Sequence, residues 1–284
     1  MRPVDPGGLM SLAPLYAKAA VGAVLPGRGT TLPADEVVRD DVLVDRGHVA
    51  DYARVCGFAL SDTLPLTYPH VLGFALQVEL MARRTFPLPL PGLVHVRNRI
   101  VATRAVDAGE LLRIAVHAER FVPHPKGAQV DLVTDVAVEG APVWSGRSTY
   151  LARGATAPAG AIAAAAEELP DVSGEPAAAQ WLVPADTGRR YAAVSGDVNP
   201  IHLHPLSAKA FGFPTAIAHG MWTAARALAS MQGRLDDAMA YDVEFRKPLR
   251  LPSRVSLRTR RTADGWDLGV AGKVEHLRAT VRTA

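Results

Sequence analysis

Two stretches of this 284-residue chain resemble each other. Residues 52–57 read YARVCG and residues 191–196 read YAAVSG, so tyrosine, alanine, valine and glycine recur in the same order. Each stretch is followed by a proline-containing loop and then by an apolar helical segment, at 70–82 and at 219–231. This repeat predicts one folding unit present twice, packed as a pseudo-dimer.

Strand patterns follow each apolar helix. They cover 94–104, 111–121, 129–139 and 143–151 in the first half, and 239–245, 255–261, 266–271 and 273–282 in the second. Residues 154–179 are rich in alanine, glycine and proline, and we interpret them as a linker with a short helix at 161–169. One long helix wrapped by antiparallel strands in each half predicts an α+β fold, with domains at 1–153 and 180–284.

The composition is that of a packed protein. Charged residues make up 21% of the chain, and no stretch reaches the roughly 18 uncharged apolar residues of a membrane span, so we predict none. Residues 9–25 are mostly apolar, but Asp5 and Lys18 break the pattern of a signal peptide and favour an amphipathic surface helix. The single cysteine, Cys56, cannot form an internal disulfide, which favours a cytoplasmic location.

Asp197 and His202 are the most informative titratable pair. On a regular helix, a spacing of five would place the two side chains about 140° apart. Pro200 disfavours helix at Asn199 and cannot donate a backbone hydrogen bond, so the helix of 189–196 should end before it. We therefore expect Asp197 at the helix end and His202 on a returning loop to converge, as general acid–base chemistry requires. An Asx turn with a surface histidine remains open.

A second candidate group is Gly220, at the start of the apolar helix of 219–231. A glycine there would present a backbone N–H at a helix N-terminus, where it can polarise a carbonyl oxygen. Close packing of that helix against the sheet would explain the glycine equally well.

The stretch 191–228, YAAVSGDVNPIHLHPLSAKAFGFPTAIAHGMWTAARAL, resembles the hydratase motif of the MaoC-like family, over about 35 contiguous residues. The resemblance implies a double hot-dog fold and the reversible hydration of trans-2-enoyl thioesters, or dehydration of (R)-3-hydroxyacyl thioesters. It implies Asp197 and His202 as the catalytic pair, with Gly220 and Asn199 contacting the substrate. It also implies no metal and no cofactor. Some single-domain members of the family carry a serine about eight residues after the motif glycine; that position is Leu228 here, so no serine role is carried over.

The resemblance also suggests a carrier. Residues 245–248, FRKP, resemble a strand-end segment that often lies near the pantetheine and nucleotide, so Arg246 and Lys247 are candidate phosphate contacts. The net charge is +3, with lysines and arginines scattered, so no nucleic-acid stripe is expected. A mildly basic surface suits the phosphates of coenzyme A or an acidic acyl carrier protein. Two units in one chain make a monomer sufficient, although a homodimer is also open.

The first half lacks the catalytic pair. An ungapped alignment of the repeats places Phe58 opposite Asp197 and Thr63 opposite His202. We therefore expect one active site per chain, in the C-terminal half. Residues 58–74 are apolar enough to line an acyl-chain tunnel, as in two-domain relatives, but ordinary core packing is an equal explanation.

The sequence also permits three other interpretations. Asp197 with His202, His204 and His219 could bind a metal, although His204 is better explained as a helix cap or surface residue. Cys56 could be a nucleophile, but it lies in the inert repeat. The chain could also be a non-catalytic thioester-binding subunit or a hot-dog thioesterase; no acid occurs in 221–230, where such thioesterases usually carry one.

Overall fold

The computed structural model describes residues 28–163 and 167–283, so the helix expected within 9–25 lies outside the described residues. In chain order the elements are β1 (Val37–Val42), α2 (Arg46–Cys56), α3 (Tyr68–Ala82), β2 (Leu93–Ala102), β3 (Leu112–His124), β4 (Gly127–Val138), β5 (Ala141–Arg153), β6 (Ala177–Val183), α4 (Thr187–Ser195), α5 (Pro200–Leu203), α6 (Pro205–Ala210), α7 (Gly220–Ala229), β7 (Met239–Phe245), β8 (Ser253–Arg261), β9 (Gly265–Ala271) and β10 (Glu275–Thr283).

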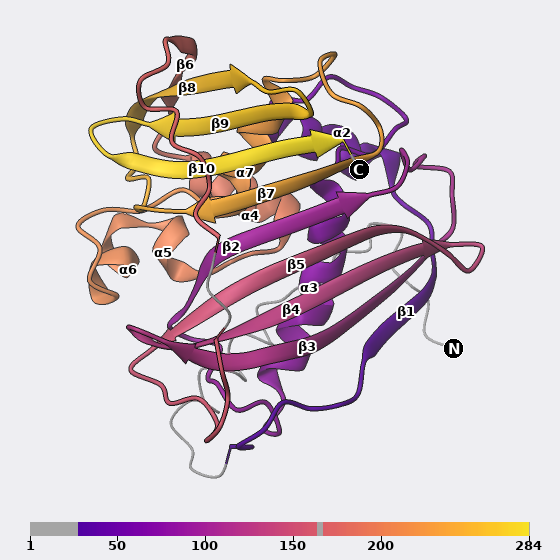
Figure 1. The fold of residues 1–284 in the computed structure, drawn as a ribbon, viewed down its shortest axis with the longest axis vertical. Coiled ribbons are helices and arrows are strands. Elements are labelled where there is room, and N and C mark those ends of the chain that lie inside the picture. The colour runs from indigo at the N-terminus through magenta and orange to yellow at the C-terminus, as the bar shows by residue number, and fades with distance from the viewer. Residues whose placement is uncertain (1–27, 164–166, 284) are drawn as a thin grey trace.

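One antiparallel ten-stranded sheet runs through both halves (Figure 1). Its order is β1-β3-β4-β5-β2 in the first half, continued by β7-β10-β9-β8-β6 in the second. Each half therefore places its corresponding strands in mirrored order from the sheet centre. The halves join where β2 pairs with β7, from Arg97 opposite Glu244 to Ala102 opposite Met239. This order is what the internal repeat predicts for two copies of one unit.

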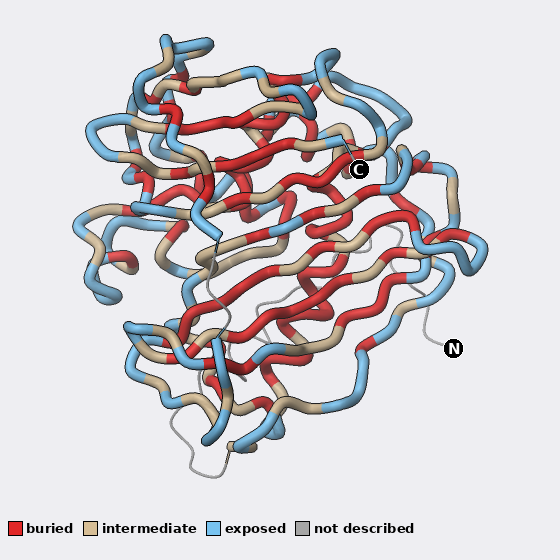
Figure 2. Tube along the Cα trace, viewed as in Figure 1, coloured by how far each residue is buried: buried red, intermediate tan, exposed pale blue. Residues whose placement is uncertain are grey.

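The two apolar helices lie behind the sheet in the view of Figure 1. α3 buries 13 of its 15 residues and α7 buries eight of its ten. A helix that is apolar on all sides is typical of a buried position, and both helices lie among the buried segments of Figure 2. Two buried helices wrapped by antiparallel strands form the expected α+β, double hot-dog arrangement.

Several sequence-based boundaries differ from the structure. Every predicted strand is present, but the edge strands β1 and β6 and the short helices α5 and α6 were not expected. β6 begins at Ala177, so the expected domain boundary at 180 falls inside a strand. The short helix expected at 161–169 is wrong for the described residues of that range, which are not helical. Among the described residues, no helix is long and apolar enough to cross a membrane.

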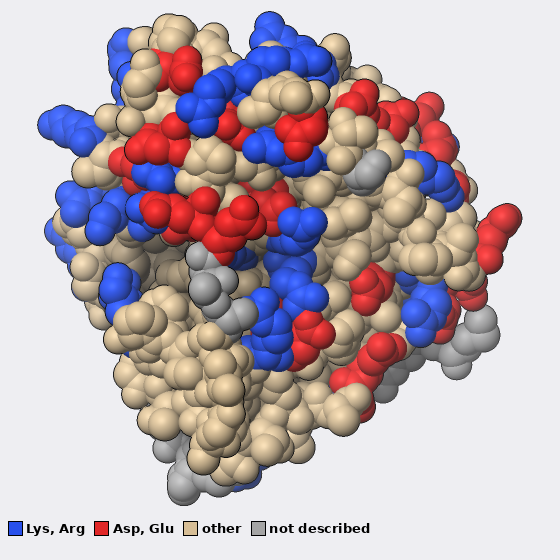
Figure 3. Space-filling view, in the orientation of Figure 1, with Lys and Arg blue, Asp and Glu red and all other residues tan. Residues whose placement is uncertain are grey.

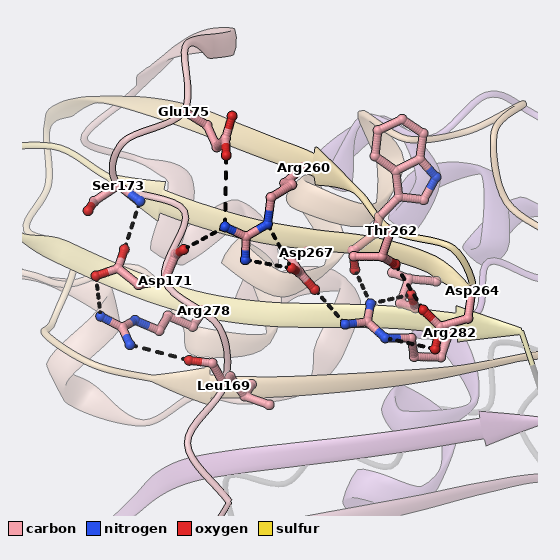
Figure 4. Close-up of polar contacts among 12 residues, drawn as sticks. Leu169, Asp171, Ser173, Glu175, Arg260, Thr262, Asp264, Asp267, Arg278 and Arg282 are labelled. Carbon is pink, nitrogen blue, oxygen red and sulfur yellow. Dashed lines mark hydrogen bonds and ion pairs between the residues drawn. The ribbon is translucent and has the colours of Figure 1, made fainter.

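The segment before β6 is held on the outer face of the C-terminal strands (Figure 4). Arg278 of β10 donates to Asp171 at 3.0 Å, and Arg260 of β8 donates to the Asp171 carbonyl at 3.3 Å. Val172 is buried against Gly269, where a Cβ would come within 2.7 Å of a Val172 methyl carbon. Acidic and basic side chains are intermixed over the upper part of this view (Figure 3). This segment is therefore fixed by ion pairs and packing as well as by chain connectivity.

Candidate active site

The helix α4 ends where the sequence predicts. Its C-cap is Gly196, with φ of 72°, a left-handed conformation that glycine adopts without steric penalty. Asp197 follows, and its Oδ1 accepts a hydrogen bond from the Asn199 backbone N–H at 3.1 Å. The Asx turn that was open from the sequence is thus present, and it orients the Asp197 carboxylate.

His202 lies on a short helix and not on the expected returning loop. Asn199 is the N-cap of α5, accepting from the Ile201 N–H at 3.4 Å, and Pro200 occupies the first helical position. Proline favours that position because it has no N–H to satisfy and its φ is already helical. His202 is buried, with 8% of its surface exposed, so it is not a surface histidine. The side-chain oxygen of Asn199 is engaged in the cap.

Asp197, His202 and His219 come together. One ligand-type atom from each side chain lies within 4.8 Å of the others. His202 Nδ1 donates to the Ile217 carbonyl at 2.8 Å, which leaves Nε2 with its lone pair. Burial lowers the pKa of His202, and the Asp197 carboxylate opposes that shift. His202 is therefore a neutral imidazole with a basic nitrogen held beside a carboxylate.

His219 has a role that the sequence did not reveal. Its Nε2 donates to the backbone carbonyl of Asp197 at 3.0 Å and lies 3.7 Å from the Asp197 carboxylate. Its ring stacks on His202 with centroids 3.7 Å apart. Burial, reinforced by His202, lowers the pKa of His219 to about 3, so it stays neutral. His219 contacts both members of the pair, whereas the sequence had suggested it only as a candidate metal ligand.

Gly220 is the first residue of α7, and His219 is the N-cap. Amides in the first turn of a helix have no partner within the helix, so the Gly220 N–H is suited to an oxyanion. A Cβ at Gly220 would lie 3.0 Å from the Phe245 ring. Both interpretations of this glycine, the free amide and the close packing, are compatible with the structure.

The histidine tautomers do not suit a metal ion at this cluster. The His219 nitrogen near the Asp197 carboxylate is Nε2, and its hydrogen is directed to the Asp197 carbonyl. A metal ligand must present a lone pair. His204, the fourth residue of the metal hypothesis, is instead the N-cap of α6, accepting from the Leu206 N–H at 3.1 Å. The donor set therefore fits proton transfer better than metal coordination.

The candidate phosphate contacts and the candidate nucleophile differ in whether their side chains are free to react or bind. Arg246 pairs with Glu244 at 2.6 Å and with Glu275 at 3.4 Å, so two carboxylates already neutralise its charge. The Lys247 carbonyl accepts from His276, and the Lys247 side chain is exposed. Cys56 is fully buried, and burial raises its pKa to about 12, which removes the thiolate that a nucleophile needs.

A cavity of about 210 Å³ lies between residues 58–144 of the N-terminal half and residues 228–239 of the C-terminal half. We call it the first-half cavity. Its lining includes Phe58 and Thr63, the residues that align with the catalytic pair, together with Leu228 of α7 and Met239 of β7. The position corresponding to the acid–base pair is thus occupied by apolar and hydroxyl side chains around an open space.

A family model described as MaoC like domain matches residues 172–278. The chain is 39% identical over 281 residues to 3-hydroxyacyl-thioester dehydratase X of Mycobacterium tuberculosis, an alignment that covers 98% of this chain and 99% of that protein. The chain belongs to the MaoC-like dehydratase family. The matched residues 172–278 include Asp197, His202, His219 and Gly220.

Solved structures of MaoC-like proteins share the fold. A crystal structure of HtdX from Mycobacterium tuberculosis superposes with a TM-score of 0.78 at 36% identity, covering 88% of this chain and all of that one. A MaoC-like dehydratase from Phytophthora capsici gives a TM-score of 0.74 at 19% identity, covering 90% of this chain and 97% of that one. These structures confirm the double hot-dog arrangement for a MaoC-like chain of this length.

Proposed function

We propose that this MaoC-like chain catalyses the reversible hydration of trans-2-enoyl thioesters, and the reverse dehydration of (R)-3-hydroxyacyl thioesters. The observation that carries the proposal is the convergence of Asp197 and His202 beside the N-terminus of α7. A base, a carboxylate and an unpaired helix amide are the groups that water addition next to a thioester carbonyl requires. The 39% identity to a 3-hydroxyacyl-thioester dehydratase supports the same reaction.

In the hydration direction, water lies between Asp197 and His202. His202 Nε2 accepts one proton as the water oxygen adds to C3 of the enoyl group, while Asp197 accepts a hydrogen bond from the other O–H. The carboxylate also stabilises the imidazolium that forms. Negative charge moves to the thioester oxygen, where the Gly220 N–H donates to it. His202 then returns the proton to C2 on the same face, and dehydration follows the same steps in reverse.

We propose that the N-terminal half, residues 1–153, accommodates the acyl chain. Leu228 follows Gly220 by eight residues on α7, which corresponds to roughly 12 Å along the helix. Leu228 also lines the first-half cavity. A thioester whose carbonyl binds at Gly220 would therefore direct its tail along α7 towards that cavity, so the cavity would affect longer chains selectively.

The carrier of the substrate is coenzyme A or an acyl carrier protein. Lys247 is the better candidate for a phosphate contact because Arg246 is already paired with two carboxylates. A lysine contributes a point charge to phosphate binding, which falls with ionic strength. Replacing Lys247 with glutamine should raise KM for a coenzyme A thioester and leave KM for the corresponding pantetheine thioester unchanged.

The central test follows the loss of enoyl absorbance with trans-2-butenoyl and trans-2-decenoyl thioesters. Asp197→Asn and His202→Gln should each lower kcat by about 10² to 10⁴, the range of a positioned acid or base. His204→Gln is the matched control, since this histidine only caps α6 and is exposed. Full activity of both dyad variants, or inactivity of the wild-type protein on every chain length, would disprove the proposal.

The acyl-chain assignment has a separate test. Leu228→Trp should fill part of the first-half cavity and lower kcat/KM for the decenoyl substrate, with little effect on the butenoyl substrate. An equal loss for both substrates would indicate that the substitution disturbs α7 and would argue against this binding path.

A further inference from the structure

The active site of the C-terminal half is bordered by a strand of the N-terminal half. The β2–β7 ladder ends at Arg97 opposite Glu244. Just beyond that pair, the β2–β5 register shifts between His95 and Arg97. A β-bulge of this kind redirects a side chain. Here the His95 ring lies edge-on to Phe245 at the end of β7, with centroids 5.0 Å apart.

Two observations connect His95 with the groups assigned to catalysis. Phe245, which it contacts, also packs at the Gly220 position, where a Cβ would lie 3.0 Å from the ring. Burial lowers the pKa of His95 and of its stacked neighbour His70, whose ring centroid is 5.9 Å away, and the Asp197 carboxylate opposes that shift at both rings. A carboxylate of the C-terminal half therefore acts electrostatically on two imidazoles of the N-terminal half.

The two ends of the β2–β7 ladder carry different side chains. At one end, Met239 begins β7 opposite Ala102, which ends β2, and both line the first-half cavity. His95, near the start of β2, and Phe245, at the end of β7, lie at the opposite end of the same ladder, on the catalytic side. One end of the ladder therefore borders the first-half cavity, and the other end carries an imidazole.

His95 is held in place as a neutral hydrogen-bond acceptor. Burial, reinforced by His70, lowers its pKa to about 3. The Arg97 backbone opposes this lowering of the pKa, as expected where a ring N–H donates to a carbonyl, and we assign that N–H to Nδ1 because Nε2 has no partner among the described residues. Nε2 is buried and, within the described part of the chain, has no hydrogen-bond partner. The His95 ring stacks on Tyr150 with centroids 4.8 Å apart. The Tyr150 hydroxyl in turn donates a hydrogen bond to the Gln77 side chain at 3.1 Å.

We propose that His95 is a substrate-binding residue supplied by the N-terminal half, whose Nε2 accepts a hydrogen bond from an O–H or N–H group of the bound acyl thioester. The donor is the 3-hydroxyl of the acyl chain or an amide N–H of the pantetheine arm. Pairing on binding gives a reason for a buried acceptor that is otherwise unsatisfied, an arrangement that native proteins rarely keep. The proposal rests on the proposed function for the identity of the ligand.

Binding measurements with ligands that cannot react test this without turnover. Isothermal titration calorimetry would compare three ligands. Butyryl-pantetheine has amide donors only, and the S-ethyl thioester of 2,2-difluoro-3-hydroxybutyrate has the hydroxyl donor only and no C2 hydrogen to eliminate. S-ethyl thiobutyrate has neither donor. His95→Leu should weaken one of the two donor-bearing ligands about tenfold, the effect of one hydrogen bond. Binding of the donor-free thioester should stay within about twofold of wild type.

Two further variants separate hydrogen bonding from packing. His95→Gln keeps a side-chain acceptor and should bind the affected ligand within about threefold of wild type. His117→Leu is the matched control, because His117 also has a buried ring nitrogen without a hydrogen-bond partner in the described part of the chain but lies on β3, three strands from β2; it should change no ligand. Equal weakening of all three ligands by His95→Leu, or no weakening of any, would overturn the proposal. Wild-type protein that binds the ligands but hydrates no enoyl thioester would contradict the proposed function alone.

Discussion

Replacing His219 with leucine should disable the site without removing a group that we assign to proton transfer. The substitution removes the Nε2–H donor to the Asp197 carbonyl, a 3.0 Å hydrogen bond, and the ring that stacks on His202. Asp197 and His202 both remain. The expected loss therefore measures how much of the rate depends on their relative position.

The structure sets the magnitude. Leaving a buried carbonyl unpaired costs about 1–3 kcal/mol. The Asp197 side chain is 24% exposed, so water can approach this residue, and we expect the lower part of that range, about 1–2 kcal/mol or a fall in Tm of roughly 2–6 °C. Displacing a catalytic group by about 1 Å can lower a rate by about 10². We therefore expect kcat to fall about 100-fold with KM nearly unchanged.

The assay is enoyl hydration measured across pH, together with thermal unfolding. His219→Gln keeps an N–H donor and should recover at least tenfold of the lost kcat, and His204→Leu should behave as wild type. The acid limb of kcat/KM should not move, because His219 is neutral and is not among the groups that shift the pKa of His202. A kcat within threefold of wild type for His219→Leu, or a loss confined to KM, would refute the positioning role.

Three further outcomes are expected. Because burial lowers the pKa of His202, the acid limb of hydration should lie below the usual titration range of histidine. In Asp197→Asn the carboxylate that opposes this lowering is gone, so the acid limb of the residual activity should move lower still, and a move upward would contradict the assignment. Gly220→Ala places a methyl group 3.0 Å from the Phe245 ring, which should displace the amide donor and lower kcat by about 10 to 10². Adding Phe245→Leu should make room for that methyl group and restore part of the lost kcat. Gly188→Ala places a Cβ 2.0 Å from the His202 carbonyl oxygen. This clash should destabilise the protein by about 1–3 kcal/mol and lower kcat at least tenfold. Unchanged kinetics would show that α5 can shift freely.

The sequence predicted the two copies of one folding unit correctly, but not the short helices and edge strands. The repeated hexapeptide predicted two copies of one unit, and proline at 200 predicted the break that lets Asp197 and His202 converge. The expected loop is a short helix because Asn199 caps it and proline favours a first helical position. The edge strands β1 and β6 were missed because edge strands bury little: β1 has one fully buried residue, Val37, so its alternation is weak.

The histidines show where sequence reasoning reaches its limit. His219 belonged to the motif that was recognised, yet its role depends on which carbonyl its N–H meets, and that carbonyl belongs to a residue 22 positions earlier. His95 carries no motif at all. Its direction comes from a β-bulge and from contact with a ring in the other half of the chain, and both are products of tertiary structure.

The junction of β2 and β7 also frees the two halves from having to match. In a dimer of identical subunits, the two ends of such an interface are encoded by the same gene. Any side chain that suits one end is therefore also present at the other end. Here the two ends are encoded separately, and a single molecule carries His95 at one and Met239 at the other. Covalent fusion therefore allows one pocket to be tuned for a polar group while its twin is tuned for hydrocarbon, and the pair cannot be separated by dilution.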